Sequence, residues 1–188
     1  GILMSSTLAR QIYEDLRCEI ESGQLNKNRF ITETQIAERY HVSKAPVKAA
    51  LKQLCQEAFL TSYPRKGYLI NILSPEEYAE LRYVRKHYEK LSVILAIENA
   101  SDRDIESLRN ISSSDYASKT VNTQFHIRLA AIGGNSYHAE VISRLMNFQL
   151  LLPMSEADVD TPHERIIAAL LERDCEKALQ LLDEDLQE

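Results

Sequence analysis

The stretch from Thr32 to Leu54, which reads TETQIAERYHVSKAPVKAALKQL, constrains the fold more than any other part of the chain. Apolar residues recur there at helical spacing on both sides of a tight turn at His41. Thr32 and Gln35 form a capping box, which marks the start of the first helix. The turn requires a residue with positive φ, and His tolerates this conformation better than a β-branched residue does. The stretch therefore predicts two short helices joined by a tight turn.

The second of these helices carries a regular strip of positive charge. Ser43 is its predicted N-cap, and Pro46 falls in its first turn, where a missing N–H has no intrahelical partner to lose. Lys44, Lys48 and Lys52 follow at i, i+4 and i+8, beside the apolar face. This layout is typical of a helix-turn-helix, whose second helix enters the major groove of DNA. A lysine strip alone is also typical of a solvated helix face, so the turn and the following hairpin decide the interpretation.

A short hairpin is predicted directly after the two helices. Residues Leu60–Tyr63 and Tyr68–Ile72 read as strands around the basic turn Pro64-Arg65-Lys66-Gly67. Before the motif, residues Leu8–Ser22 predict a further helix, which Gly23 ends. Helix, helix-turn-helix and hairpin together predict a winged helix-turn-helix.

The charge of the chain is divided unevenly along its length. The formal net charge is −6, which by itself argues against a DNA-binding protein. Residues 1–72 carry ten Lys and Arg against seven Asp and Glu, whereas residues 73–188 carry twelve against twenty-one. This asymmetry assigns nucleic-acid contact to the first part alone. We therefore expect a DNA-binding domain over residues 1–72 and a second domain over residues 73–188.

The second part of the chain predicts helices only. Ser74-Pro75-Glu76-Glu77 combines an N-cap, a proline at the first helical position and acids that the helix dipole favours. Helices are expected at about 75–98, 101–110, after the loop 112–114 as far as 132, and at 137–152, 162–172 and 175–186. The expected fold class is mainly α, with an N-terminal winged helix-turn-helix and a C-terminal all-α helical bundle.

Composition places the chain among ordinary soluble proteins, at 44% hydrophobic and 27% charged residues. No signal peptide is recognisable, and no apolar run approaches the roughly 20 residues that span a bilayer. Cys18, Cys55 and Cys175 lack metal-type spacing and are expected to be free thiols in the core. We therefore expect a cytoplasmic protein without a membrane partner.

The chain resembles the GntR family of bacterial transcription regulators, in its FadR-like branch. In the first part the resemblance rests on IESGQL and on TETQIAERYHVSKAPVKAALKQLCQEAFLTSYPRKGYLI, which are similar to the winged-helix signature of the family. In the second part it rests on a sparser set, namely Val84-Arg85, Glu89, Phe125-His126, Gly134-Asn135, His163-Glu164, Ile167, Asp174 and Ala178. The resemblance implies an all-helical effector domain of the FCD type.

The resemblance also implies where DNA is bound. The second helix of the motif would enter the major groove by its N-terminal end, and the wing would follow the backbone or the minor groove. The implied DNA-binding residues are Thr34, Ser43, Lys44, Ala45, Lys48, Arg65, Lys66 and Gly67. Lys44 and Lys48 stand where the family usually has arginines, which bind guanine bidentately as lysine cannot. We expect shifted or weaker base discrimination, with the attraction to phosphate retained.

In this family the effector domain often holds a divalent metal on one aspartate and three histidines. The resemblance places these ligands at Asn122, His126, His163 and Asp185. Two imidazoles and a carboxylate are a workable set for Zn²⁺, Ni²⁺ or Mn²⁺. Asn122 would add only a neutral oxygen, so we expect lower affinity than at an intact site. The alternative is a metal-free cavity in which the two histidines are hydrogen-bonded core residues.

A small organic acid is the effector that the resemblance implies, because its carboxylate would complete the coordination of a metal or meet a nearby cation. Arg85 matches an arginine that commonly faces this cavity, and it is the implied effector-binding residue. Glu89 stands four residues later on the same helix, so an ion pair between the two is the alternative role of Arg85. The two roles are compatible.

The predicted function is that of a ligand-responsive repressor, which binds a palindromic operator in double-stranded DNA as a homodimer. The effector would act through the linker near Ile72–Pro75. One alternative is a DNA-binding protein whose helical part only dimerises, as the departures at Asn122 and Asp185 suggest. Another is a metal-dependent enzyme, since two histidines and a carboxylate can activate water. No separate general base is recognisable, and an enzyme would not need a winged helix.

Overall fold

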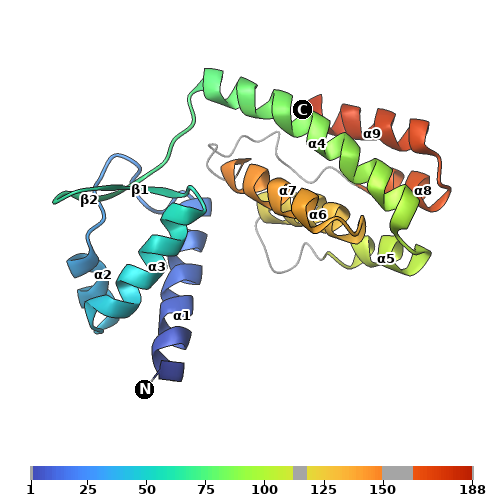
Figure 1. Ribbon diagram of the computed structural model, residues 1–188. Helices are drawn as coiled ribbons and strands as arrows, with labels where there is room; N and C mark the ends of the chain where they lie inside the picture. Colours follow the sequence, from blue (N-terminus) through green and yellow to red (C-terminus); the bar gives the residue numbers. More distant parts are fainter. Residues whose placement is uncertain (1, 112–117, 150–162, 188) are drawn as a thin grey trace. The chain divides into compact units, whose positions relative to one another are not determined.

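The computed structural model describes residues 2–111, 118–149 and 163–187 (Figure 1). The described residues divide into two compact units, one that ends at Leu73 and one that begins at Ser74. The fold is mainly α with a small two-stranded sheet, as predicted. No described helix combines the length and the apolar character needed to cross a membrane.

The first unit consists of three helices and a hairpin: α1 (Ile2–Glu21), α2 (Glu33–Tyr40), α3 (Lys44–Gln56), β1 (Leu60–Tyr63) and β2 (Gly67–Ile70). Helix α3 packs against α1, α2 and β1 and so forms the centre of the unit. Its buried residues include Val47, Leu51 and Leu54, and Leu16 of α1 and Phe59 before β1 are buried as well. The opposite side of α3 is left for solvent.

The turn between α2 and α3 has the predicted geometry. The capping box of Thr32 and Gln35 is present, with both side-chain bonds formed. His41 adopts the left-handed conformation, with φ of 54°. Ser43 occupies the N-cap position of α3, but its side chain makes no capping hydrogen bond, so the prediction was right about the position and wrong about the bond. The hydroxyl of Ser43 stays on the exposed surface.

The second strand of the wing begins and ends earlier in the sequence than predicted. Strands β1 and β2 pair antiparallel from Leu60 opposite Ile70 to Tyr63 opposite Gly67. β2 therefore begins at Gly67 and ends at Ile70, two residues before the predicted end. Gly67 has φ of +114°, and a Cβ there would collide with the carbonyl oxygen of Ile31. Glycine is needed at this position because of the close backbone approach.

Two other expectations, the start of the first helix and the burial of the cysteines, require correction. Helix α1 begins at Ile2 and not at Leu8, because no glycine or proline interrupts the residues between them. The thiols are free but do not lie in the core: Cys18 is exposed, and Cys55 and Cys175 are half-buried. Cys18 lies off the stripe through Leu16 that α1 buries.

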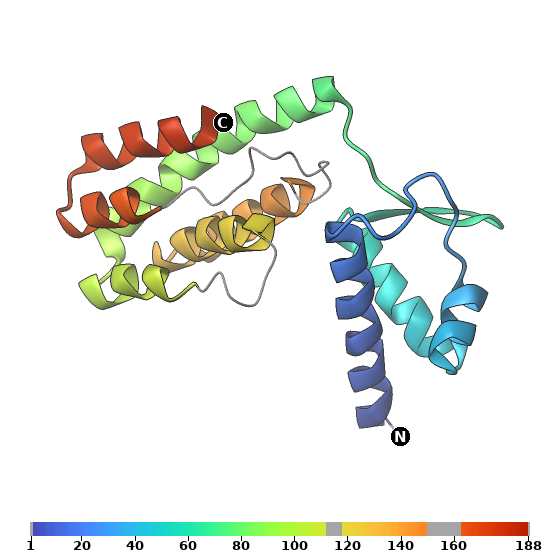
Figure 2. The ribbon, with the colours of Figure 1, turned by 180° about the vertical axis from the view of Figure 1, so that it is seen from behind.

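The described part of the second unit is helical throughout. Its elements are α4 (Pro75–Asn99), α5 (Asp102–Glu106), the 3₁₀ turn η1 (Ser107–Asn110), α6 (Ser118–Ile132), α7 (Ser136–Gln149), α8 (Glu164–Leu171) and α9 (Cys175–Gln187). The long helix α4 packs against α6, α7 and α9, which lie alongside it in both views (Figures 1 and 2). The core between them includes Val93, Phe125, Leu129, Leu170 and Leu182.

The helix starts in this unit follow the predicted signals. Ser74 and Glu77 form a capping box at the start of α4. The helix expected at 101–110 is α5, which continues into η1. Helix α8 begins at Glu164, with His163 at its N-cap, whereas the predicted start at 162 lies outside the described residues. The predicted loop at 112–114 and the predicted end of a helix at 152 also lie outside them.

Candidate functional site

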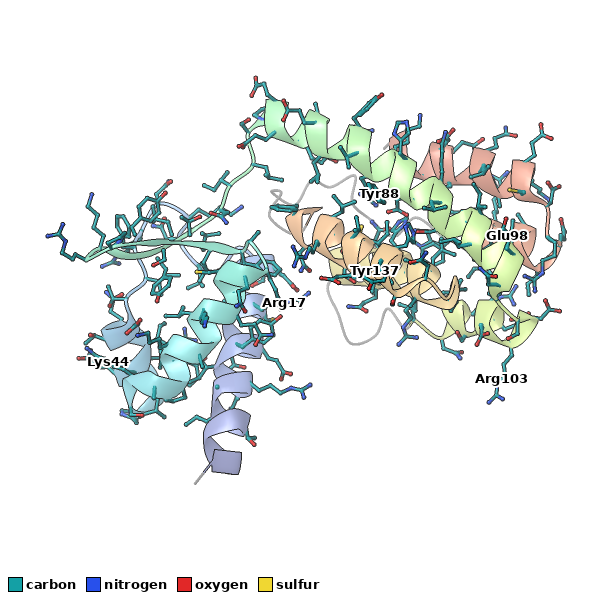
Figure 3. The ribbon with its side chains drawn as sticks, in the orientation of Figure 1. Arg17, Lys44, Tyr88, Glu98, Arg103 and Tyr137 are labelled. Atoms are coloured by element: carbon teal, nitrogen blue, oxygen red, sulfur yellow. The ribbon has the colours of Figure 1, made fainter. Side chains whose placement is uncertain are left out.

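The predicted DNA-binding residues lie at the start of α3, on α2 and on the wing. Lys44 stands at the N-terminal end of α3 (Figure 3). It is exposed together with the other predicted positions on this surface: Thr34, Ser43, Ala45, Lys48, Arg65 and Lys66. Gly67 is half-buried, because it begins β2 directly after the turn, close to the carbonyl oxygen of Ile31.

Two arginines of the same unit are used differently from these lysines. Arg17 is bonded to Glu21 and Tyr13, and Arg39 forms an ion pair with Glu19. In the part of the first unit that the structure describes, no ion pair involves Lys44 or Lys48. The exposed start of α3 thus presents positive charge that the unit does not neutralise, and such charge attracts phosphate.

Three of the four predicted metal ligands come together inside the second unit. His126 lies on α6, His163 at the start of α8 and Asp185 on α9, and one ligand atom of each lies within 4.8 Å of the others. Nε2 of His126 lies 3.2 Å from Oδ2 of Asp185. Nε2 of His163 lies 3.4 Å from the same oxygen. Segments far apart in the sequence therefore direct two imidazoles at one carboxylate.

Three polar atoms at this centre are buried and have no hydrogen-bond partner. His126 is fully buried, and about a tenth of the side chain of His163 or Asp185 is exposed. Neither Nε2 atom makes a hydrogen bond, because its contact with Asp185, although short, does not have hydrogen-bond geometry. Oδ1 of Asn122, one turn before His126 on α6, is also buried without a partner. Each such atom costs about 1–3 kcal/mol, so this set fits a bound divalent cation.

A second carboxylate, Glu89, supports the centre from α4. Its Oε2 lies 2.7 Å from Nδ1 of His126, and its Oε1 accepts a hydrogen bond of 3.0 Å from Nε of Arg85. Burial opposes ionisation of Glu89, but His126 and Arg85 outweigh it and lower the pKa of Glu89 to about 2. The predicted ion pair of Arg85 with Glu89 is thus present, and the arginine is buried beside the centre.

Sequence reasoning did not assign Glu89 to the site. Its signals were its place among the residues that carry the family resemblance, which gave it no role, and the i, i+4 spacing from Arg85, which is common on solvated helix faces. Phe125 was also not assigned, although its ring stacks on that of His163 at 3.8 Å between centroids and 6° between planes. Both residues fix the orientation of an imidazole, and this role depends on contacts between different helices.

The electrostatics of the centre favour a positive charge between the carboxylates. Burial raises the pKa of Asp185, but the two histidines outweigh burial and hold the pKa below its ordinary range. Burial lowers the pKa of His126, but Glu89 and Asp185 outweigh burial and raise it. The carboxylates would therefore stabilise either a proton or a metal cation at the imidazole nitrogens, and the two would compete for these nitrogens.

The other three histidines lie apart from the centre. His138 on α7 is buried, with Nε2 at 2.8 Å from Oγ of Ser92. His87 is exposed, with Nδ1 at 2.9 Å from the carbonyl oxygen of Tyr83. His41 belongs to the turn before α3.

Two models of known protein families match this chain, one in each of its two units. A model described as bacterial regulatory proteins of the gntR family matches residues 8–70, and a model of the FCD domain matches residues 80–188. The second match alone extends over more than half of the chain. These families, and the relatives described in the next paragraph, are transcription regulators and not enzymes.

Among curated proteins, the chain is similar to the uncharacterised regulator YdhC of Bacillus subtilis, at 27% identity over 86% of this chain and 64% of YdhC. It is 29% identical to the Nta operon transcriptional regulator of Aminobacter aminovorans, over 56% of this chain and 54% of that protein. The chain thus spans less than two thirds of these two relatives. The transcriptional repressor GlaR of Escherichia coli is 25% identical over 93% of this chain and 90% of GlaR.

Two solved structures share the fold. McbR/YncC of E. coli has a TM-score of 0.74 at 20% identity, over 96% of this chain and 93% of its own. A putative GntR regulator from Rhodococcus sp. RHA1 has a TM-score of 0.75 at 20% identity, over 95% and 93%. The chain belongs to the GntR family of bacterial transcription regulators and joins a DNA-binding helix-turn-helix to an FCD domain.

Proposed function

We propose that this regulator represses transcription as a homodimer on a palindromic operator, and that a small organic acid bound in its FCD domain changes its affinity for DNA. The observation that carries the proposal is the buried centre of His126, His163 and Asp185, with unsatisfied nitrogens inside a regulatory domain. A repressor role is supported by the name of the relative GlaR, which is described as a transcriptional repressor.

The proposed DNA contact is made by the exposed start of α3 and by the wing. Lys44 and Lys48 would bind phosphates from the major-groove side, and Arg65 and Lys66 would follow the backbone. Thr34, Ser43 and Ala45 complete the surface around the N-terminal end of α3. Gly67 contributes indirectly, because it permits the turn that presents the wing.

The proposed dimer surface is an apolar face of the second unit. Four large hydrophobic residues are exposed on α4 and one on α7, namely Tyr83, Val84, Tyr88, Leu91 and Tyr137. Tyr88 and Tyr137 lie on these two packed helices (Figure 3). A cluster of exposed aromatic and aliphatic side chains supports association with a second copy. Two copies would present two helix-turn-helix motifs to the two halves of a palindrome.

The proposed effector site holds a divalent cation, Zn²⁺, Ni²⁺ or Mn²⁺, on His126, His163 and Asp185, with Asn122 as a weak fourth ligand. Such an ion supplies open coordination positions for the carboxylate of an organic acid. Arg85 adds positive charge beside the site and is the proposed effector-binding side chain, in addition to its ion pair with Glu89. The neutral Asn122 makes the cation binding moderate in strength.

A route from this site to the linker runs through α9 and α4. Nη2 of Arg82 donates a hydrogen bond of 2.7 Å to the carbonyl oxygen of Leu186, the neighbour of the ligand Asp185. Lys86 and Lys90 lie 3.7 and 3.5 Å from Asp183. These contacts fasten the end of α9 to α4, the helix that directly follows the linker. A shift of Asp185 on effector binding would therefore be passed to α4.

Asn122 also supports a second candidate, in which the FCD domain dimerises but responds to no effector. One experiment separates the two. An operator is selected from random duplex DNA with the protein, and its affinity is measured with chelator, with Zn²⁺, and with Zn²⁺ plus a series of organic acids. The proposed function predicts a change of about 5–150-fold with at least one acid, which is a typical allosteric coupling of about 1–3 kcal/mol. Equal affinities under all conditions would support the second candidate.

A further inference from the structure

We infer that Glu89 is a positioning residue of the buried histidine centre: it holds the hydrogen of His126 on Nδ1, so that the lone pair of Nε2 is available to a cation. The inference extends the proposed metal site to a residue outside the ligand set. It rests on the proposed function only where it concerns the cation. The tautomer of His126 is a property of the metal-free protein and can be measured separately.

The argument begins with the geometry of the carboxylate. Oε2 of Glu89 lies 2.7 Å from Nδ1 of His126, and both side chains are fully buried. An ionised carboxylate only accepts hydrogen bonds, whereas a neutral imidazole has one N–H and one lone pair. The short contact therefore requires the hydrogen on Nδ1. Nε2 is then left with the lone pair, and it makes no hydrogen bond.

The second oxygen of Glu89 explains why the carboxylate stays in place. Oε1 accepts a hydrogen bond of 3.0 Å from Nε of Arg85, one helical turn earlier on α4. Bonds on both oxygens prevent rotation of the carboxylate. Arg85 is 6% exposed, and a buried guanidinium of this kind needs a charged partner. Arg85 thus anchors Glu89, and Glu89 orients His126.

A carboxylate behind a ligating histidine is a common arrangement at protein metal sites, because it fixes the tautomer and makes the ligand nitrogen more basic. Nε2 of His126 is directed accordingly, at 3.2 Å from Oδ2 of the ligand Asp185. The ring of His163 is held differently, by stacking on Phe125. Removal of the Glu89 acceptor should therefore affect His126 and leave the tautomer of His163 unchanged.

The test needs variants that do not leave a buried charge without its partner. Glu89→Leu alone would strand the guanidinium of Arg85 in the interior. Two double variants avoid this problem: Arg85→Met/Glu89→Gln keeps an acceptor oxygen, and Arg85→Met/Glu89→Leu has none. The two differ little in size and are both neutral, so their comparison isolates the acceptor. Circular dichroism checks that each full-length protein is folded.

The ring nitrogens are observed by NMR in ¹⁵N-histidine-labelled, metal-free protein at a pH above the raised pKa of His126, where its ring is neutral. Zn²⁺ affinity is measured by competition with a chelating dye. We expect the Nδ1–H tautomer at His126 in the wild type, its retention in the Gln variant and its loss in the Leu variant. The Zn²⁺ affinity of the Leu variant should fall about 10–100-fold, with the Gln variant in between. If the Gln variant alone folds, retention of Nδ1–H at His126 there agrees with the inference, whereas loss of Nδ1–H there contradicts it.

Nε2–H at His126 in the wild type, or an unchanged tautomer in a folded Leu variant, would overturn the inference. Failure of the proposed metal site has a different signature. In that case no protein binds Zn²⁺, while the wild type still shows Nδ1–H at His126 and the Leu variant loses it. This outcome would support the role of Glu89 in orienting His126 and would reject the proposed cation.

Discussion

The two units of this chain arrange their polar chemistry in opposite ways. In the first unit, Lys44 and Lys48 stand on the exposed side of a helix whose other side forms the core. In the second, His126, Glu89 and Asp185 point inward and contact one another across three helices. The exposed surface suits a large, charged partner such as DNA, because the lysines remain free to adapt to it. The buried centre suits a small ligand, because its groups are held before the ligand arrives.

The contrast also determines how each unit should respond to substitution. Exposed lysines contribute to binding and little to folding, so their removal should weaken DNA binding in a graded, salt-dependent way. Buried ligands act as a set, so removal of one should abolish cation binding. The predictions below test this difference, beginning with the largest expected effect.

His163→Ala should abolish binding of divalent cations while the protein stays folded. The imidazole of His163 provides one of the converging ligand atoms. Because its side chain is slightly exposed, the surrounding side chains and solvent can fill the space that it leaves. Loss of its stacking on Phe125 should cost about 0.5–1.5 kcal/mol of stability. Metal titration and thermal unfolding measure the two effects. His87→Ala is the control, since His87 is exposed and lies outside the centre. Cation binding that survives in His163→Ala would remove His163 from the site.

Lys44→Ala/Lys48→Ala should weaken operator binding strongly and flatten its dependence on salt. Each phosphate contact adds about 0.9 to the slope of log affinity against log salt on duplex DNA, so two lost contacts should lower it by about 1.8 per subunit. Fluorescence anisotropy over a series of salt concentrations provides the measurement. Lys52→Ala is the matched control, because Lys52 belongs to the same strip but lies farther from the N-terminal end of α3. A double variant with the slope of the wild type would contradict the proposed placement of α3.

Val84→Glu should dissociate the proposed dimer. Val84 is exposed among the large hydrophobic residues of α4, and a charge buried in such an interface costs binding energy without a partner. We expect the dimer dissociation constant to rise by at least about tenfold, which corresponds to about 1.4 kcal/mol. Sedimentation velocity at several concentrations measures it. Glu98→Lys, on the same helix, serves as a control for charge. An unchanged dimer dissociation constant would show that Val84 does not lie in the dimer interface.

Asn122→Asp should strengthen cation binding, on the order of tenfold or about 1.4 kcal/mol. The change replaces an unsatisfied neutral oxygen with a carboxylate, one turn before His126 on the same helix. It should leave DNA binding without cation unaltered. Competition for Zn²⁺ with a chelating dye compares it with the wild type. If neither protein binds a cation, the centre is not a metal site, and any effector must be held by direct contacts.

Arg82→Gln should affect only the coupling between effector and DNA, and should weaken it by about 0.5 kcal/mol, the lower end of the range for such residues. The variant loses the charge-assisted hydrogen bond to the carbonyl oxygen of Leu186, beside the ligand Asp185. Zn²⁺ affinity and effector-free DNA affinity should stay close to those of the wild type. Only the difference between DNA affinities with and without effector should shrink. An undiminished difference would exclude this contact from the route.

Local features were predictable from the sequence because their signals are local. The capping boxes at Thr32 and Ser74 and the positive φ of His41 involve residues within four positions of one another. The start of α1 at Ile2 was missed because no residue between Ile2 and Leu8 signals a helix boundary. No glycine or proline there interrupts the helix. The end of β2 was misplaced because pairing with β1, and not the apolar pattern, sets its length.

The buried centre was only partly predictable. Family resemblance pointed to His126, His163 and Asp185, but helical periodicity could not show that they meet, because they belong to different helices. The role of Glu89 beside His126 was invisible in the sequence, because a buried carboxylate and a solvated one have the same i, i+4 spacing from an arginine. A site that is formed by side chains from several helices can be predicted only when the packing of those helices is known.

The most direct test of the account is to measure operator affinity of the wild type and of His163→Ala side by side, with Zn²⁺ and an organic acid found in the screen. We predict that the acid changes the affinity of the wild type by about 5–150-fold. We predict no change for His163→Ala, whose affinity without effector should equal that of the wild type. An equal response of both proteins to the acid would contradict the claim that the histidine centre controls DNA binding.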